Sequence, residues 1–427
     1  MLAVYEYPVN KSWKKLLLRP SFDNSSLEAS VSNILKEVRE NGDSSVRRFA
    51  TMFDKVSIDN LSVSLEEIEA AANEIDEDLK VAIQNAKANI EKFHRAQLIT
   101  EEPVEIVSGV KCWRKSVAIE KVGLYIPGGS APLFSTILML GIPATIAGCK
   151  EITLCTPPNR EGKIHPAILY SASLVGVTQI YKVGGAQAIG AMAYGTASIP
   201  KVFKIFGPGN QYVTCAKQLV QKDGVAIDMP AGPSEVAVIA DDTANAAYVA
   251  ADMLSQAEHG NDSQAILVTT SSKLASDTKV EIEQQLKLLP RKDIALIALQ
   301  SSKIFVVKTI KEAIELINEY APEHLIISCE NDEEIAEKIV NAGSVFLGNY
   351  SPESVGDYAS GTNHTLPTNG YAKAYSGVST ESFVKKITFQ KLSKEGLQLI
   401  GKTVGLMAAA EGLDAHKNAV TVRLSDV

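Results

Sequence analysis

The sequence predicts an α/β protein: two doubly wound, incomplete Rossmann-like lobes built on parallel sheets, with helical extensions at both ends of the chain. Short apolar runs typical of buried strands alternate with helix-length segments from residue 122 onward. The alternation comes in two series, separated near the segment AIDMPAGPSE. The length of 427 residues also suits more than one domain, at about 150 residues per domain.

The first 120 residues are expected to be largely helical. Residues 25–56 and 64–97 carry apolar side chains at helical spacing, and Ser64 with Glu67 matches a capping box at the start of the second segment. We expect residues 1–22 to form an N-terminal extension, and residues 23–121 to join residues 235–380 in the first α/β lobe.

Residues 122–234 are expected to form the second lobe, with strands at 122–126, 151–155, 179–183 and 201–206. The strands expected in the first lobe lie at 235–240, 264–270, 324–329 and 344–348. Residues 381–427 then form a C-terminal helical tail with one amphipathic helix. Such a tail is too small to own a core, so it must dock on something larger.

Four glycine-rich loops follow or precede predicted strands: IPGGSAP (126–132), VGGAQAIG (183–190), FGPGNQY (206–212) and MPAGPSE (229–235). Ligands of open α/β sheets bind beyond the carboxyl ends of the strands, where a glycine loop and a helix N-terminus favour phosphate. Tight strand-to-helix turns explain each loop equally well. The loop GPGNQY fails as a dinucleotide fingerprint, because Tyr212 replaces the third glycine and Asp228, near the spacing of the ribose acid, precedes a Met-Pro turn.

Composition excludes several classes of partner. The net charge of −8 argues against nucleic acid or an anionic membrane as the main partner. No apolar run approaches a membrane span, and the N-terminal residues lack the core of a secretory signal. The five cysteines are scattered and form no C-x-x-C pair, which fits reduced thiols in a cytoplasmic protein.

The six histidines carry the strongest chemical signal. Gln256 and His259, in SQAEHGND, are spaced to share one face of a helix end, although a lone Q-x-x-H is more often an ordinary polar turn. Three further histidines, His324, His364 and His416, lie near Glu323, Asp357 and Glu411 respectively, whereas His94 and His165 lack such company. Together these groups predict a divalent-metal site with an acid–base pair, and nitrogen and oxygen donors without thiolate suit zinc.

Several long motifs occur in a distinctive order: VGLYIPGGSAPLFSTILMLGIPA, FGPGNQYVTCAK, DMPAGPSE, SQAEHGNDSQ, APEHL and GDYASGTNH. In this order they resemble the histidinol dehydrogenase family, from about Val122 to His416, with a looser similarity through the N-terminal helices. The resemblance implies zinc-dependent oxidation of L-histidinol to L-histidine through L-histidinaldehyde, with two NAD⁺ consumed. It also implies a homodimer whose C-terminal segments cross to complete shared active sites.

The resemblance also assigns residues. The implied zinc ligands are Gln256, His259, Asp357 and His416, and these would also contact the substrate. Glu323 and His324 match the catalytic pair, with His324 at the substrate as well. Further substrate contacts match Ser234, His364 and Glu411, and NAD contacts match Tyr125, Gln187 and Asn210. His324 suits the base for the alcohol proton, and Glu323 suits activation of water for the aldehyde step.

Two other functions remain open from the residues alone. A metal-dependent hydrolase would use Glu323 and a metal-activated water but no dinucleotide, so NADH formation separates it from a dehydrogenase. A non-catalytic metal- or solute-binding protein of the same architecture would have no need of a Glu-His pair at a strand mouth.

Overall fold

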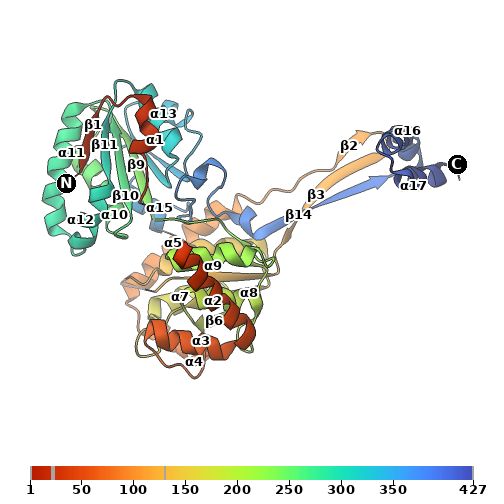
Figure 1. Cartoon of the computed structure of the whole chain (residues 1–427), viewed down its shortest axis with the longest axis horizontal. Coiled ribbons are helices and arrows are strands. Elements are labelled where there is room, and N and C mark those ends of the chain that lie inside the picture. The colour runs from red at the N-terminus through yellow and green to blue at the C-terminus, as the bar shows by residue number, and fades with distance from the viewer. Residues whose placement is uncertain (1, 21–24, 129–130, 426–427) are drawn as a thin grey trace.

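The computed structural model describes residues 2–20, 25–128 and 131–425, and it contains two α/β lobes and a projecting arm (Figure 1). The lobes lie next to each other, while the arm leads away from them and carries the C-terminal helices at its far end. The predicted fold class is confirmed, because each lobe is built on a parallel sheet covered by helices on both faces.

The first lobe contains a six-stranded parallel sheet in the order β1-β11-β10-β9-β12-β13. Its strands are β1 (Ala3–Glu6), β9 (Glu235–Ala240), β10 (Gln264–Thr269), β11 (Lys303–Val306), β12 (His324–Ser328) and β13 (Ser344–Leu347). One face packs on α10 (Ala246–Ala257), α11 (Ser272–Gln285) and α12 (Lys292–Ser301); the other packs on α1 (Asn10–Leu16), α13 (Ile310–Tyr320) and α14 (Asp332–Ala336). Alternate residues of each central strand therefore enter different cores, as in β9, where Val236 and Val238 face one core and Ala237 and Ile239 the other.

The second lobe contains a five-stranded parallel sheet in the order β6-β5-β4-β7-β8. The strands are β4 (Lys121–Tyr125), β5 (Glu151–Thr156), β6 (Gln179–Lys182), β7 (Lys204–Phe206) and β8 (Ala226–Ile227), and the helices between them are α6 (Phe134–Ala147), α7 (Pro166–Leu174), α8 (Gly185–Tyr194) and α9 (Gln211–Gln221). All eight strands predicted in the two lobes are present. The strands β1, β8 and β11 were not predicted, because they are short or lie at an edge.

The N-terminal helices belong to the second lobe, so the predicted assignment of residues 23–121 to the first lobe is wrong. The helices α2 (Ser25–Asn41), α3 (Asp43–Phe49) and η1 (Ala50–Asp54) share one core with α8 and α9, and α4 (Leu65–Asn73) and α5 (Glu77–Arg95) share the other with α6 and α7. Their periodicity predicts an apolar face but not the sheet that this face covers. The predicted capping box of Ser64 and Glu67 is present at the start of α4.

The arm is an antiparallel sheet that the sequence analysis missed. Its strands are β2 (Val104–Val107), β3 (Val110–Ala118) and β14 (Val384–Leu392), and β14 pairs with β3 along nine residues. The tail from residue 381 is therefore partly a strand, followed by two helices, α16 (Lys394–Ala410) and α17 (Asp414–Ser425). Because the partner of β3 lies more than 260 residues further along the chain, local pattern could not indicate the pairing.

The extension at residues 1–22 is also tied to the fold where it is described, since β1 pairs in parallel with β11 at the edge of the six-stranded sheet. All five cysteines are free thiols. Among the helices of the described ranges, none combines the length and apolarity that crossing a membrane demands.

Candidate active site

A cavity of about 1050 Å³ lies between the two lobes and contains most of the predicted site. Its walls include Ser234, Gln256, His259, Glu323, His324, Asp357 and His364 from the first lobe, and the loop 207–211 and the start of α6 from the second. Segments that are distant in sequence thus meet in one cleft.

The two sheets present opposite ends to this cavity. In the second lobe the lining loop follows β7, at the carboxyl end of the sheet, as expected. In the first lobe the lining residues Ser234, Glu323 and His324 lie at the amino ends of β9 and β12, so the expectation of a carboxyl-end site is wrong there. The cavity consequently meets helix N-termini from the second lobe and helix C-termini, such as that of α10, from the first.

This arrangement separates the electrostatic preferences of the two walls. The C-terminal end of a helix carries partial negative charge and favours a cation, and Gln256 and His259 lie at the C-terminal end of α10. The N-terminal end of a helix favours an anion, and Asn210 caps the start of α9 by accepting from the N–H groups of Tyr212 and Val213.

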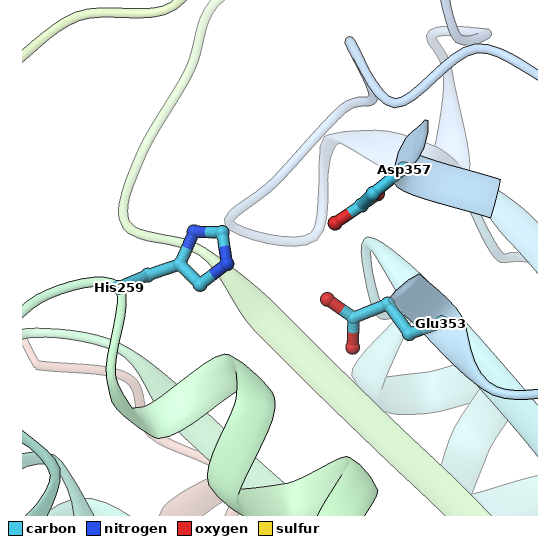
Figure 2. Close-up of side chains that lie close together, drawn as sticks. All are labelled: His259, Glu353 and Asp357. Carbon is cyan, nitrogen blue, oxygen red and sulfur yellow. The ribbon is translucent and has the colours of Figure 1, made fainter. Parts of the chain in front are cut away.

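Three side chains at the first wall form a cluster that suits a metal ion. Ligand atoms of His259, Glu353 and Asp357 all lie within 4.8 Å of one another. Figure 2 shows the imidazole and the two carboxylates pointing toward a common centre. Desolvation by the surrounding protein lowers the pKa of His259. The lowered pKa favours the neutral imidazole, which is the form that binds metals.

Gln256 completes this cluster from the last turn of α10, where its side chain is fully buried. With its nitrogen toward Glu353, the amide donates to that carboxylate, and its oxygen accepts from the backbone N–H of Glu235 at 2.8 Å. With its oxygen toward Glu353, two acceptors face each other and require a proton or a cation between them. Burial raises the pKa of Glu353 well above its ordinary value, so both orientations are chemically accessible.

Glu323 and His324 are held by the neighbouring strand. Oε2 of Glu323 accepts from the backbone N–H of Glu235 at 2.9 Å, and Nδ1 of His324 lies 3.2 Å from the carbonyl oxygen of the same residue. His324 is also surrounded by carboxylates: Nδ1 lies 3.7 Å from Glu323 and from Glu353, and Nε2 lies 3.5 Å from Asp357. The parallel pairing of β9 with β12 thus orients both predicted catalytic groups.

These surroundings shift both groups. Burial raises the pKa of Glu323 to about 8, although the imidazole beside it opposes the shift. Burial lowers the pKa of His324, but the carboxylates of Glu353, Glu323 and Asp357 outweigh it and raise that pKa to about 10. A divalent cation at the adjacent cluster would offset this negative charge and make neutral His324 accessible nearer neutral pH.

A buried ion pair lies at the start of β9, the strand whose backbone contacts Glu323 and His324. Arg19 pairs with Glu235, with Nη2 2.8 Å from Oε2, and donates to the carbonyl oxygen of Tyr320 at 2.7 Å. Its guanidinium carbon lies 4.0 Å from the centre of the Tyr320 ring. The N-terminal segment therefore anchors the residue whose backbone holds Glu323 and His324.

A second cavity, of about 1420 Å³, lies in the second lobe and contains all three predicted NAD contacts, Tyr125, Gln187 and Asn210. Pro127 and Asn210 line both cavities, so the two spaces meet there. Both polar atoms of the buried Gln187 amide lack hydrogen-bond partners in the described part of the chain. Such orphaned atoms in a roomy cavity are suited to a polar ligand.

The remaining predicted residues divide into two groups. Ser234 lines the first cavity, and His364 is fixed there by contacts at both ring nitrogens, 3.0 Å from Thr136 Oγ1 and 3.0 Å from the carbonyl oxygen of Asp357. Glu411 and His416 are exposed, and neither lines the cavity of its own chain. Glu411 directly follows α16 and His416 lies on α17, and these two helices are at the far end of the arm in Figure 1.

The sequence analysis missed two residues of the first cavity's surroundings, Glu353 and Glu235. Glu353 could have been found, since it precedes Asp357 by four residues and shares one face of α15 (Glu353–Tyr358) with it. Glu235 carried no such signal, because its partner Arg19 is 216 residues away in sequence.

The fold and the site together define a two-lobed α/β protein with a candidate metal site and a carboxyl–imidazole pair suited to proton transfer. Residues 17–424 match the family model for histidinol dehydrogenase, and the chain belongs to this family. It is 61% identical over 426 residues to a histidinol dehydrogenase of Bacteroides fragilis, with 100% of both chains covered. It is 53% identical to that of Mannheimia succiniciproducens, covering 97% of this chain and 96% of the relative.

A crystal structure of histidinol dehydrogenase from Elizabethkingia anophelis is similar along the whole chain. The TM-score is 0.98 at 56% sequence identity, with 100% of this chain and 98% of the other covered. The family suspected from the sequence motifs is therefore confirmed.

We predict that Arg19→Met lowers the free energy of unfolding by about 3 kcal/mol, because it leaves the buried carboxylate of Glu235 unpaired. Urea denaturation measures the loss. Arg39→Met is the matched control, since Arg39 also pairs with a carboxylate, Asp223, and lies over a tyrosine ring, but at the surface. The control should lose no more than about 1 kcal/mol. Equal losses in the two variants would contradict a special role for the buried pair.

Proposed function

We propose that the protein oxidises L-histidinol to L-histidine through L-histidinaldehyde, with zinc bound in the cleft and two NAD⁺ consumed per substrate. Family membership supports the overall reaction. The observation that carries the chemistry is the position of the Glu323–His324 pair beside the cluster of His259, Glu353 and Asp357. The direct test is NADH formation, followed by absorbance, when histidinol and NAD⁺ are added. A metal-dependent hydrolase would form none.

The donor set suits zinc. Gln256, His259 and Asp357 would hold the ion from one chain and His416 would complete the set, which contains nitrogen and oxygen atoms but no thiolate. When bound, zinc supplies a template that orients the amine and imidazole of the substrate and stabilises developing negative charge on its oxygen. The same four residues, together with Ser234, His364 and Glu411, would contact the substrate.

His324 would take the hydroxyl proton while a hydride leaves the substrate carbon for NAD⁺. Its ring is already oriented by the carbonyl oxygen of Glu235, which fixes the imidazole before the substrate arrives. Glu323 would accept a proton from the water that adds to the aldehyde in the second oxidation. Both groups are buried, and the exclusion of bulk water limits loss of the reactive aldehyde.

The second cavity would hold NAD⁺ against Tyr125, Gln187 and Asn210, with the nicotinamide reaching the substrate where the two cavities meet. The shared lining residues Pro127 and Asn210 support this route. The hydroxyl of Tyr125 already accepts from the backbone N–H of Gly185 at 2.9 Å, so the tyrosine also fixes the N-terminus of α8.

We also propose a homodimer in which the arm delivers Glu411 and His416 to the partner subunit. The helix α17 has no buried residues in this chain, and Leu399, Leu406 and Met407 on α16 are more than half exposed. Burial of this apolar surface against a second copy would complete each site with borrowed residues. No nucleic acid or membrane partner is expected, and five free thiols are consistent with the cytoplasm.

Chelation should abolish activity, and added zinc should restore it, because the proposed zinc site would hold the substrate through the metal. The measurements are metal content by mass spectrometry and the thermal unfolding midpoint, together with activity. The fold should persist without metal, since the four apolar cores do not include the cluster. Full activity in protein shown to be free of metal would overturn the metal proposal.

Glu323→Gln should slow aldehyde oxidation by at least about 100-fold and alcohol oxidation much less, because only the aldehyde step needs activated water. The carboxyl must be ionised to act as base, and burial raises its pKa above the ordinary value, so wild-type aldehyde oxidation should rise with pH as Glu323 loses its proton. The variant should lack this rise. Single-turnover measurements with each substrate distinguish the steps, and equal slowing of both would contradict the assignment.

Co-refolding of two inactive variants, His416→Ala and Glu323→Ala, tests the shared site. If tails are exchanged, a mixed dimer has one site with both defects and one intact site. Random pairing makes about half of the dimers mixed, so roughly a quarter of wild-type activity should return. If His416 serves its own chain, no activity returns even when mixed dimers are shown to have formed.

A further inference from the structure

The cavity of the second lobe contains a carboxylate that the proposed reaction does not use. Asp54 ends η1, one of the N-terminal helical segments, and lines the same cavity as Tyr125 and Gln187. Its Oδ2 atom is buried and has no hydrogen-bond partner within the described ranges. Burial is the main cause of the raised pKa of the Tyr125 phenol. The nearby charge of the Asp54 carboxylate raises that pKa further.

Other orphaned polar atoms lie around the same space. Both ends of the Gln187 amide and the hydroxyl of Thr156 are buried without partners among the described residues, and both side chains line this cavity. Gly185 adopts a positive φ of 65°, and a Cβ there would come within 2.8 Å of Gln187 Oε1. The glycine thus keeps the amide accessible, and the set as a whole is matched to a ligand with several hydroxyl groups.

The acid at the usual ribose spacing is not available for this task. Asp228 forms a buried ion pair with Lys217, whose Nζ lies 2.5 Å from Oδ1, and its Oδ2 accepts from the backbone N–H of Gly207 at 2.8 Å. Lys217 also donates to the carbonyl oxygen of Gly207 at 2.8 Å. This pair is fully committed to fixing the glycine loop after β7, which leaves Asp54 as a half-buried acid whose buried Oδ2 atom has no partner in the described part of the chain.

We propose that Asp54 accepts hydrogen bonds from the hydroxyl groups of the adenosine ribose of the dinucleotide, and that it thereby selects against a 2′-phosphate. This inference rests on the proposed binding of NAD in this cavity. A carboxylate accepts from two vicinal hydroxyls but repels a phosphate at the same position. Asp54 lines only the second cavity, away from the metal cluster, which assigns it to the adenosine half rather than to the nicotinamide half.

Exposed charged side chains also line this cavity, and some of them favour a 2′-phosphate. A preference for the 2′-phosphorylated nucleotide is therefore a reasonable alternative that an experiment can distinguish. Arg160 and Lys163 line the cavity with exposed side chains and would attract a 2′-phosphate, while Glu67, Glu74 and Glu161 carry the opposite charge. Glu67 is paired with Lys182 and is not free to act. The selection depends on whether the half-buried Asp54 or the exposed basic side chains lie nearer to the ribose.

The test is calorimetric binding of 5′-AMP, adenosine 2′,5′-bisphosphate, NAD⁺ and NADP⁺ to the full-length protein and to Asp54→Asn. Wild type should bind 5′-AMP and NAD⁺ more tightly than their 2′-phosphorylated forms. The variant should bind 5′-AMP and NAD⁺ about tenfold more weakly and lose most of the discrimination. Glu74→Gln, which removes an exposed carboxylate from the same cavity, should behave as wild type.

Stability separates a binding effect from misfolding. Burial raises the pKa of Asp54 to about 6 from an ordinary 3.8, so its contribution to stability is lost as pH rises through 6. Asp54→Asn should therefore be at least as stable as wild type at pH 7, with the difference vanishing toward pH 4. Thermal unfolding at the two pH values checks this.

Each contrary result has a distinct meaning. If wild type binds NAD⁺ and the variant binds all four nucleotides as wild type does, the role of Asp54 is wrong and the proposed function stands. The role of Asp54 is also wrong, and the proposed function stands, if the variant loses NAD⁺ affinity but not 5′-AMP affinity. The conclusion is the same if wild type prefers the 2′-phosphorylated forms. If wild type binds no dinucleotide, the proposed NAD site itself fails, and this inference fails with it.

Discussion

Buried negative charge around one imidazole is the constraint on which the active site depends. The carboxylates of Glu323, Glu353 and Asp357 all lie within 4 Å of His324. Three buried negative charges so close together destabilise the folded protein unless positive charge is supplied. The imidazole itself, a proton on a carboxyl group, or a cation at the cluster can each supply it. A cation that remains at the cluster would allow His324 and Glu323 to lose their protons, and the proposed proton transfers require this.

The orientation of the two sheets reinforces this constraint. One wall of the cleft is the amino end of the first sheet, where helix C-termini favour a cation, and the other is the carboxyl end of the second sheet, where helix N-termini favour an anion. The proposed metal-bound substrate and anionic dinucleotide would therefore approach each other from walls of complementary charge. Two lobes with the same end facing the cleft would lack this asymmetry.

Residues of the N-terminal region contribute to the surroundings of the site in both lobes. In the first lobe Arg19 neutralises Glu235, whose backbone positions Glu323 and His324. In the second lobe the N-terminal helices cover the sheet and bring Asp54 to the edge of the cavity that contains Tyr125. Both contacts join residues far apart in the chain, so folding of the whole chain is required before either cavity is complete.

The sequence by itself determined the parallel α/β class, eight strands of the two lobes and the helical segments between them, because apolar periodicity reports local structure directly. Long motifs also identified the family and, through it, residues such as His259 and Asp357 that the fold brings together. Only the tertiary structure decided which sheet the N-terminal helices cover, the pairing of β3 with β14, and that the amino end of β12, with Glu323 and His324, faces the cleft. These features depend on contacts between segments that are far apart in the chain, and periodicity shows that a face is apolar without showing what covers it.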